Sequence, residues 1–182
     1  MKKETILLVV VTLVVGSLGG MIFSKTSKNS TPAKLTTTSA PVVDYQQKIK
    51  VLEEVIGKEP DNRNAWVQLG HNYFDSGQQI EAIEAYSKAL ELDDNDPDVL
   101  TDQGIMYRQV GWFDKAITNF VKANELNPKH PQSLFNLGLV YRDDLHDTQK
   151  AKVAWTRYLE IVPSGKSADN VRTMLDHMEN GH

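Results

Sequence analysis

Residues 77–97 read GQQIEAIEAYSKALELDDNDP, and residues 111–131, which begin 34 positions later, read GWFDKAITNFVKANELNPKHP. The two stretches align without a gap. Their matching pairs are Gly77 with Gly111, Ala82 with Ala116, Ile83 with Ile117, Tyr86 with Phe120, Lys88 with Lys122, Ala89 with Ala123, Leu92 with Leu126, and Pro97 with Pro131. A fixed period of a few tens of residues is typical of proteins built from stacked repeats. The sequence therefore predicts a repeat architecture.

Each unit contains two segments with helical spacing of apolar residues. In the first segment, large side chains and a glycine recur at intervals of three, four and seven residues, which places them on one helical face. In the second segment a large aromatic residue lies between two alanines. We expect each glycine to lie where a side chain would keep the two helices apart. The residues are Trp66, Leu69, Gly70 and Tyr73 with Ala82, Tyr86 and Ala89; Leu100, Gly104 and Tyr107 with Ala116, Phe120 and Ala123; and Leu134, Leu137, Gly138 and Tyr141.

The segment AWVQLGHNYFDSGQQIEAIEAYSKALEL, residues 65–92, carries the pattern Trp-x2-Leu-Gly-x2-Tyr followed by alanine, an aromatic residue and alanine. This pattern, with the proline that follows it, resembles the tetratricopeptide repeat. The resemblance implies an all-α fold, an α-solenoid of three helix pairs. The repeats are expected at 63–96, 97–130 and 131–164 of a domain spanning 43–182.

Flanking helices are expected at both ends of this solenoid. Before the first repeat, Ile49, Leu52 and Ile56 share one helical face, and the segment ends near Pro60 like the second helix of a preceding unit. After the last repeat, a capping helix is predicted at about 166–179, because the exposed end of a solenoid needs a solubilising cover.

The third unit departs from the pattern. Ten positions separate Tyr141 from Ala151, whereas nine separate Tyr107 from Ala116, and the intervening stretch contains no glycine. Since glycine adopts the left-handed conformation at low cost, we expect the turn without it to need the extra residue. Asp147 is expected to cap the following helix.

The N-terminal region divides into three parts. A short tail, 1–5, precedes residues 6–23, which are free of charged side chains, and residues 24–42 are rich in Ser, Thr, Lys and Pro. As a helix the apolar run would measure about 27 Å, close to the roughly 30 Å hydrocarbon core of a bilayer. Its length favours a transmembrane helix over the alternative, a cleaved signal peptide. The polar stretch is predicted to be a disordered linker.

The simplest topology for such a chain is single-pass, with the short tail inside and the large domain exported. We therefore expect the C-terminal domain on the periplasmic or extracytoplasmic side of a bacterial inner membrane. Lysines on both sides of the apolar run nearly balance, so the distribution of positive charge does not select the orientation. These lysines are Lys2 and Lys3 before the run, and Lys25, Lys28 and Lys34 after it.

Composition excludes several classes of function. The chain has no cysteine, so disulfides, thiolate metal sites, covalent haem attachment and a cysteine nucleophile are absent. Residues 43–182 contain 15 Lys or Arg against 23 Asp or Glu, a balance of −8, which argues against binding of nucleic acid. No catalytic or cofactor motif is present, and we expect a protein that is not an enzyme and needs no cofactor.

Two acidic clusters were considered as metal sites. In the stretch DDNDPD, residues 93–98, alternating aspartates suggest a calcium loop, but Val99 stands where that loop needs glycine and Ile105 where it needs glutamate. A turn in which Pro97 opens the next helix explains the stretch better. The second cluster has the composition of a metal site but not its ligand spacing, and consists of Asp143, Asp144, His146 and Asp147. No metal site is predicted.

The resemblance further implies that the first helix of each repeat lines a concave groove that binds a protein or peptide segment. Apolar groove residues are expected to anchor the partner, and Arg108 and Arg142 to meet a carboxylate on it. The Lys and Asn residues with which some family members hold a C-terminal carboxylate are missing. The predicted groove residues are Val67, His71, Phe74, Thr101, Asp102, Ile105, Arg108, Phe135, Asn136, Leu139 and Arg142.

These features lead to the hypothesis of a non-enzymatic, membrane-tethered adaptor that binds a protein segment and helps to assemble an envelope complex. One alternative is a structural protein that associates with itself and has no separate client. Another is a factor of the kind that takes part in cytochrome c maturation, to which the resemblance is only general. The same solenoid can serve many complexes.

Overall fold

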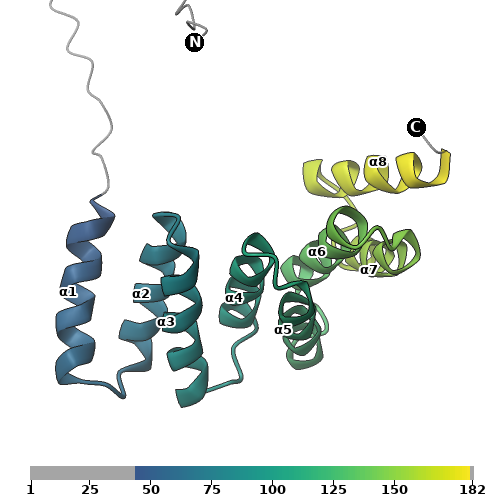
Figure 1. The fold of residues 1–182 in the computed structure, drawn as a ribbon. Helices are drawn as coiled ribbons and strands as arrows, with labels where there is room; N and C mark the ends of the chain where they lie inside the picture. The colour runs from purple at the N-terminus through teal and green to yellow at the C-terminus, as the bar shows by residue number, and fades with distance from the viewer. Residues whose placement is uncertain (1–43, 181–182) are drawn as a thin grey trace, which may run out of the picture. The chain divides into compact units, whose positions relative to one another are not determined.

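The structure is a computed structural model, and it describes residues 44–180. The predicted tail, transmembrane segment and linker, at 1–5, 6–23 and 24–42, lie outside the described residues. Helices follow one another throughout the described part, which contains no strand, so the all-α prediction is confirmed (Figure 1). Within this part, no helix combines the length and apolarity needed to cross a bilayer. The helices are α1 (Tyr45–Lys58), α2 (Arg63–Asp75), α3 (Gln79–Leu92), α4 (Pro97–Gln109), α5 (Phe113–Leu126), α6 (Pro131–Leu139), the π-helical turn η1 (Val140–Asp144), α7 (Thr148–Ile161) and α8 (Lys166–Asn180).

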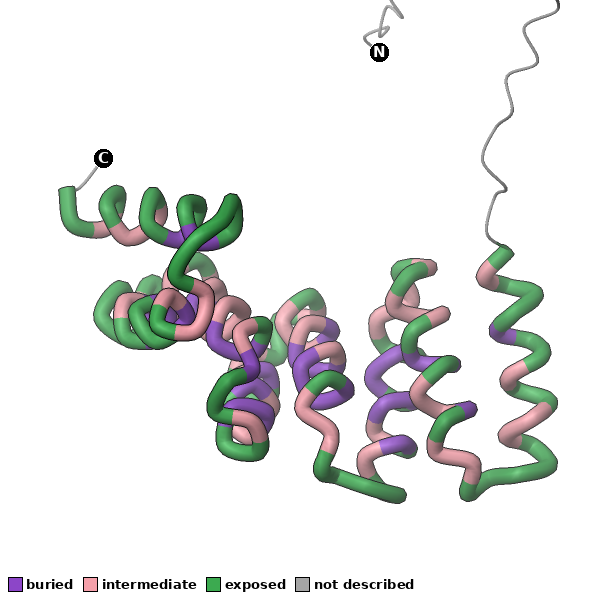
Figure 2. Tube along the Cα trace, turned by 180° about the vertical axis from the view of Figure 1, so that it is seen from behind, coloured by how far each residue is buried: buried purple, intermediate pink, exposed green. Residues whose placement is uncertain are grey.

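Helices that are neighbours in sequence are also neighbours in space. The hairpins α2/α3, α4/α5 and α6/α7 stack in order, with α1 packed on α2 and α8 on α7. Figure 2 shows buried segments recurring along the helices where they meet their neighbours. Because each pair of helices buries apolar area only against the next pair, the core is a linear series of clusters, as expected for a solenoid. We refer to α2, α4 and α6 as the A helices and to α3, α5 and α7 as the B helices.

The conserved spacing of glycine and aromatic residue within each hairpin has a steric cause. A Cβ atom placed on Gly70 would lie 2.5 Å from the Tyr86 ring, and one on Gly104 would lie 2.5 Å from the Phe120 ring. In the third hairpin, a Cβ on Gly138 would come within 2.0 Å of Nε1 of Trp155. The expectation that each glycine permits close approach of the two helices is thus confirmed.

The first two hairpins turn through a left-handed glycine. Gly77 has φ 74° and Gly111 has φ 78°, and the amide that follows each glycine donates to a carbonyl five residues back. The bonds run from Gln78 N to Tyr73 O at 2.9 Å and from Trp112 N to Tyr107 O at 2.8 Å. This is the Schellman arrangement, in which glycine takes the conformation that other residues adopt only at a cost.

The third hairpin corrects the explanation offered from the sequence. His146 adopts the left-handed conformation with φ 54° and stands two positions before the start of α7, the same offset that the turn glycines have from α3 and α5. The turn itself is therefore not lengthened. The extra residue is absorbed in η1, where Leu145 N donates to Val140 O at 3.0 Å, a bond of the wider π-helical type.

Side-chain caps mark the starts of the A helices at the same repeat position. Asn62, Asp96 and His130, each 34 residues from the next, accept hydrogen bonds from amides in the first turns of α2, α4 and α6. Pro97 is the first residue of α4, as predicted, and Asp147 caps α7 by accepting from Lys150 N at 3.0 Å. Caps of this kind are typically worth about 1 kcal/mol each.

Candidate protein-binding face

One strip of residues on the A helices stays wholly or partly exposed after the hairpins have packed. It occupies the helix positions that alternate with those buried against the B helices, so it runs across all three repeats. We call it the A-helix face, and it consists of Asn64, Gln68, His71 and Asp75 of α2; Asp98, Asp102, Ile105 and Gln109 of α4; and Gln132, Asn136 and Leu139 of α6.

The first two repeats are joined on this face by a titratable pair. Nε2 of His71 lies 3.3 Å from Oδ2 of Asp102. The hydrogen bond to Asp102 is the main cause that raises the pKa of His71 above 6.5, and burial opposes it. The His71 ring also meets the Tyr86 ring edge-on, with 5.7 Å between centroids. Two of the predicted groove residues are therefore in direct contact.

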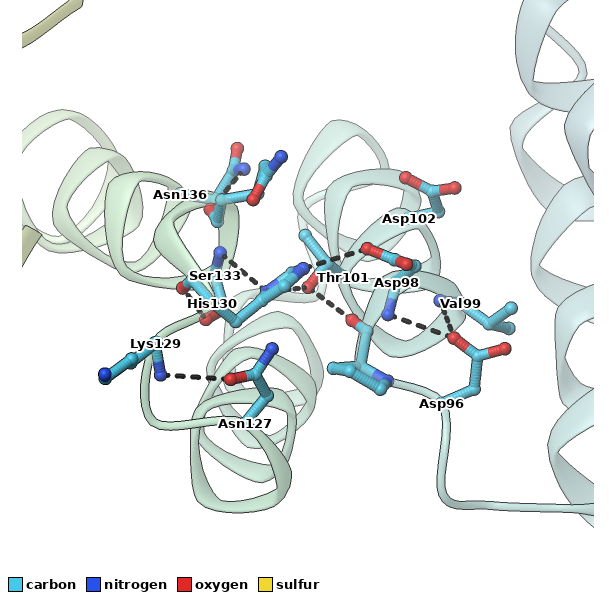
Figure 3. A network of polar contacts seen from close by, with 12 residues as sticks. Asp96, Asp98, Val99, Thr101, Asp102, Asn127, Lys129, His130, Ser133 and Asn136 are labelled. Atoms are coloured by element: carbon cyan, nitrogen blue, oxygen red, sulfur yellow. Dashed lines mark hydrogen bonds and ion pairs between the residues drawn. The ribbon is translucent and has the colours of Figure 1, made fainter. Parts of the chain in front are cut away.

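The second and third repeats are joined by a buried histidine (Figure 3). His130 is 5% exposed, and its Nδ1 accepts from Ser133 N at 3.3 Å, while its Nε2 lies 3.0 Å from Oδ1 of Asp98. Because the backbone amide must donate to Nδ1, the ring proton of the neutral histidine is on Nε2, directed at the carboxylate. The start of α6 is in this way tied to the start of α4.

Thr101 requires a correction. The sequence places it in the groove, but it is 2% exposed, and its hydroxyl donates to Pro97 O at 2.7 Å. Its oxygen also lies 3.5 Å from Nδ1 of His130 (Figure 3). Thr101 is a buried part of the junction between the repeats and cannot line an open groove.

The two arginines also differ from the expectation that they wait for a partner's carboxylate. Nε of Arg108 donates to Asp144, and Nη2 of Arg108 lies 3.3 Å from Oδ2 of Asp143. Arg142 donates through Nε to Asp143, and its guanidinium lies 4.9 Å from the centroid of the Trp155 ring. Carboxylates of the chain itself therefore already neutralise both guanidiniums.

The predicted apolar anchors are half-buried. Val67, Phe74 and Ile105 pack against the cluster that contains Tyr86 and Val99. The other two anchors, Phe135 and Leu139, pack against the cluster formed by Leu134, Trp155, Tyr158 and Val171. Each of these side chains contributes to the core and keeps part of its surface at the A-helix face.

Two hollows lie at the ends of the A-helix face. One, of about 650 Å³, is bounded by α1 and α2 and reaches Gln68 and Asn72. The other, of about 290 Å³, lies between α6, α7 and α8 and is lined by Phe135, Asn136 and Tyr158 among others. Amide side chains thus meet apolar walls at both ends of the strip, a combination suited to an elongated ligand.

The acidic residues once considered as metal ligands have other partners. Asp94 pairs with Lys122, and Asp96 caps α4 and pairs with Arg63 at 2.6 Å. Asp143 and Asp144 hold the arginines described above. Among residues 44–180, no group of three or more His, Asp or Glu side chains is arranged to hold a metal ion.

Comparison with known families agrees with this geometry. Residues 70–111 match a model described as TPR repeat, and residues 97–130 match one described as Tetratricopeptide repeat. The chain is a tetratricopeptide repeat protein. Such repeats form scaffolds for protein interaction and generally lack enzymatic activity of their own.

Solved structures share the fold. MamA superposes with a TM-score of 0.70 at 25% identity, covering 76% of this chain and 80% of MamA. A tetratricopeptide repeat protein from Parabacteroides merdae ATCC 43184 gives 0.68 at 23% identity, covering 76% and 55%. YrrB, described as a TPR protein with an unusual peptide-binding site, gives 0.66 at 22% identity, covering 71% and 66%. A search of curated protein sequences found no match.

Sequence reasoning missed the roles of His130 and Asp144 at the junctions between repeats. A signal for His130 was present, because it occupies the repeat position of the caps Asn62 and Asp96. No comparable signal pointed to Asp144, since its contact with Arg108 depends on the π-helical turn.

Proposed function

We propose that this protein is a non-enzymatic adaptor that holds a segment of another protein along the A-helix face. The observation that carries the proposal is the continuous exposed strip across three repeats with a hollow at each end. Ligand-binding surfaces need polar groups that orient the ligand and apolar groups that anchor it, and the strip offers both.

The polar groups suit an extended backbone. Side-chain amides of Asn64, Gln68, Gln132 and Asn136 each provide donors and an acceptor, and peptide groups need both. Partly exposed apolar surface at Ile105 adds an anchor between them.

Rigidity of the strip supports the same proposal. The contacts of His71 with Asp102 and of His130 with Asp98 connect adjacent repeats, as do the pairs made by Arg108. A surface already held in one arrangement loses less conformational entropy when it binds.

Photocrosslinking in cells that express the full chain tests the adaptor proposal. A photoreactive residue at Gln68 or Asn136 on the face should form an adduct with the same second protein. Placed at Val153 of α7, which is 64% exposed, it should form none. Adducts of equal yield from all three positions would contradict the proposal. A product made only of two copies of this chain would favour the self-association alternative.

The proposal extends to the N-terminal region. Residues 6–23 would anchor the chain as a single transmembrane helix, and residues 24–42 would link it to the domain at 43–182 on the extracytoplasmic side, where it would help to assemble an envelope complex. The uncharged run of 18 residues supports the anchor, since about 20 apolar residues span a bilayer.

The absence of cysteine makes the topology simple to test. A single cysteine introduced at Val153 should react with a membrane-impermeant maleimide once the outer envelope is made permeable and the inner membrane is intact. The protein should also stay in the membrane pellet at alkaline pH. Labelling only after the inner membrane is lysed would reverse the orientation, and release into the supernatant would contradict the anchor.

A further inference from the structure

One buried hydroxyl is left without a partner. The three B helices carry an aromatic residue at the same place, Tyr86, Phe120 and Trp155, and all three are 0% exposed. Phe120 has no polar atom, and Nε1 of Trp155 donates to Phe135 O at 3.0 Å. The Tyr86 hydroxyl, in contrast, makes no hydrogen bond to any residue of the described part of the chain. A buried polar group in that state is costly, and its retention calls for an explanation.

The Tyr86 hydroxyl lies beneath the A-helix face. Gly70 lets the ring pass close to the backbone of α2, since a Cβ there would be 3.0 Å from the ring carbon that bears the hydroxyl. On the same helix, the next residue, His71, covers the ring edge-on. Burial, and after it the charges of Asp102 and Asp75, raises the pKa of Tyr86, so the group stays a neutral hydroxyl beside two carboxylates.

Negative charge exceeds positive charge around this hydroxyl. Asp75 is exposed and Asp102 is one-third exposed in its side chain, and the nearby Arg63 is paired with Asp96. The remaining basic group at the junction is His71, which is a cation only below its pKa. The arginines farther along the face are held by Asp143 and Asp144.

We propose that Tyr86, Asp102 and Asp75 form a subsite that takes a lysine or arginine side chain of the bound protein segment. The N–H groups of that cation donate to the carboxylate of Asp102 and to the hydroxyl oxygen of Tyr86. Asp75 adds a second negative charge at the rim. Such charge-assisted hydrogen bonds are stronger than neutral ones, and both partner groups are already in place. The subsite rests on the adaptor proposal and defines its partner as basic at this point.

The test uses the full chain in detergent with the tyrosine rings labelled with ¹³C, and three amides as probes: N-acetylarginine, N-acetyllysine and the neutral N-acetylnorleucine. The two cations should cause saturable shifts of the Tyr86 signals, and norleucine should cause none. D102N should weaken the cation affinity about tenfold, the effect of one charge-assisted bond. The matched control D114N removes an exposed carboxylate outside the A-helix face and should leave the affinity unchanged.

A second variant isolates the hydroxyl. Y86F retains the ring, so it should raise the melting temperature of the chain without probe, and should abolish the further increase that the arginine probe causes in the wild type. The subsite is ruled out if neither cation gives saturable shifts, if D102N and D114N behave alike, or if Y86F binds the probes as the wild type does.

The crosslinking experiment keeps the two proposals apart. If adducts form at Gln68 and Asn136 but D102N and Y86F leave their yield unchanged, the subsite falls and the adaptor stands. If the cations bind but no adduct forms, the adaptor falls, and with it the assignment of the cation to a protein segment.

Discussion

The junction between the first and second repeats and the junction between the second and third use the same helices for opposite electrostatic results. At the first junction, His71 is the single basic partner facing Asp102 and Asp75. At the second, the permanently charged Arg108 is held by Asp143 and Asp144 together. One scaffold therefore carries a closed ionic contact and, one repeat away, an acidic place that is still open to a ligand.

The local backbone explains part of this difference. The first two hairpins reverse through Gly77 and Gly111, whereas the third contains η1 before its turn at His146. The wider π-helical turn carries both carboxylates that hold Arg108. Insertions of this kind often mark functional positions in helices, and here the insertion closes a junction.

The steric limit at the hairpins gives the largest expected effect. Gly138→Ala should destabilise the domain by about 3 kcal/mol, because the new Cβ would collide with the Trp155 ring, which is completely buried and cannot move aside. Gly57→Ala in α1 is the matched control: nothing lies within 4 Å of its Cβ, and it should leave stability unchanged or raise it by up to about 1 kcal/mol. Urea unfolding followed by circular dichroism measures both. Equal effects would mean that the third hairpin tolerates a wider spacing.

The closed junction should be more sensitive to loss of charge than the open one. Asp144→Asn should cost about 2 kcal/mol, because it leaves the Arg108 guanidinium, which is 24% exposed, with only the weaker contact to Asp143. Asp102→Asn should change the free energy of unfolding much less, since His71 and Asp102 are more exposed. A larger effect at Asp102 in the same urea titration would reverse the comparison.

The turns should respond in opposite directions to equivalent changes. Gly111→Ala should destabilise by about 1 kcal/mol, because alanine is strained at φ 78°. His146→Gly should stabilise by up to about 1 kcal/mol, since it removes the same strain at φ 54°. Thermal unfolding of the two variants checks the signs. A destabilising His146→Gly would show that the imidazole makes a contact worth more than the strain.

The smallest effect concerns pH at the open junction. The pKa of His71 should lie above 6.5 in an NMR titration of the wild type and should fall in Asp102→Asn, which removes its main cause. Because the folded-state pKa is raised, the stability that this pair contributes is fully present below pH 6.5. It is lost as the pH rises through the folded-state value. An unchanged titration of His71 in the variant would mean that the contact does not persist in solution.

Periodicity predicted a large part of this molecule. The pairing of Gly70 with Tyr86 and of Gly104 with Phe120 recurs at a fixed distance, and each pair records a local steric need of a hairpin. The cap at Asp147 follows from residue type and position in the same way. Such features depend on residues close together in the chain, which is why they can be read from its pattern.

The candidate site was predicted less well. Placing Thr101 in the groove followed the repeat position, but its burial depends on the loop that brings His130 over it. Arg108 and Arg142 were expected to be free, because nothing in the spacing shows that η1 turns two carboxylates toward them. The orphaned hydroxyl of Tyr86 was equally invisible.

Residue order alone thus settled the hairpins, the order in which they stack and the surface that remains for a partner, since these follow from helical periodicity and from the size of the residues at the contacts. The three-dimensional arrangement decided which charges on that surface are already neutralised. Asp144 is 36 residues from Arg108 and Tyr86 is 16 residues from Asp102. Electrostatic pairing depends on distances of a few ångströms in space, which the helix geometry and the π-helical turn determine and the spacing of residue types does not.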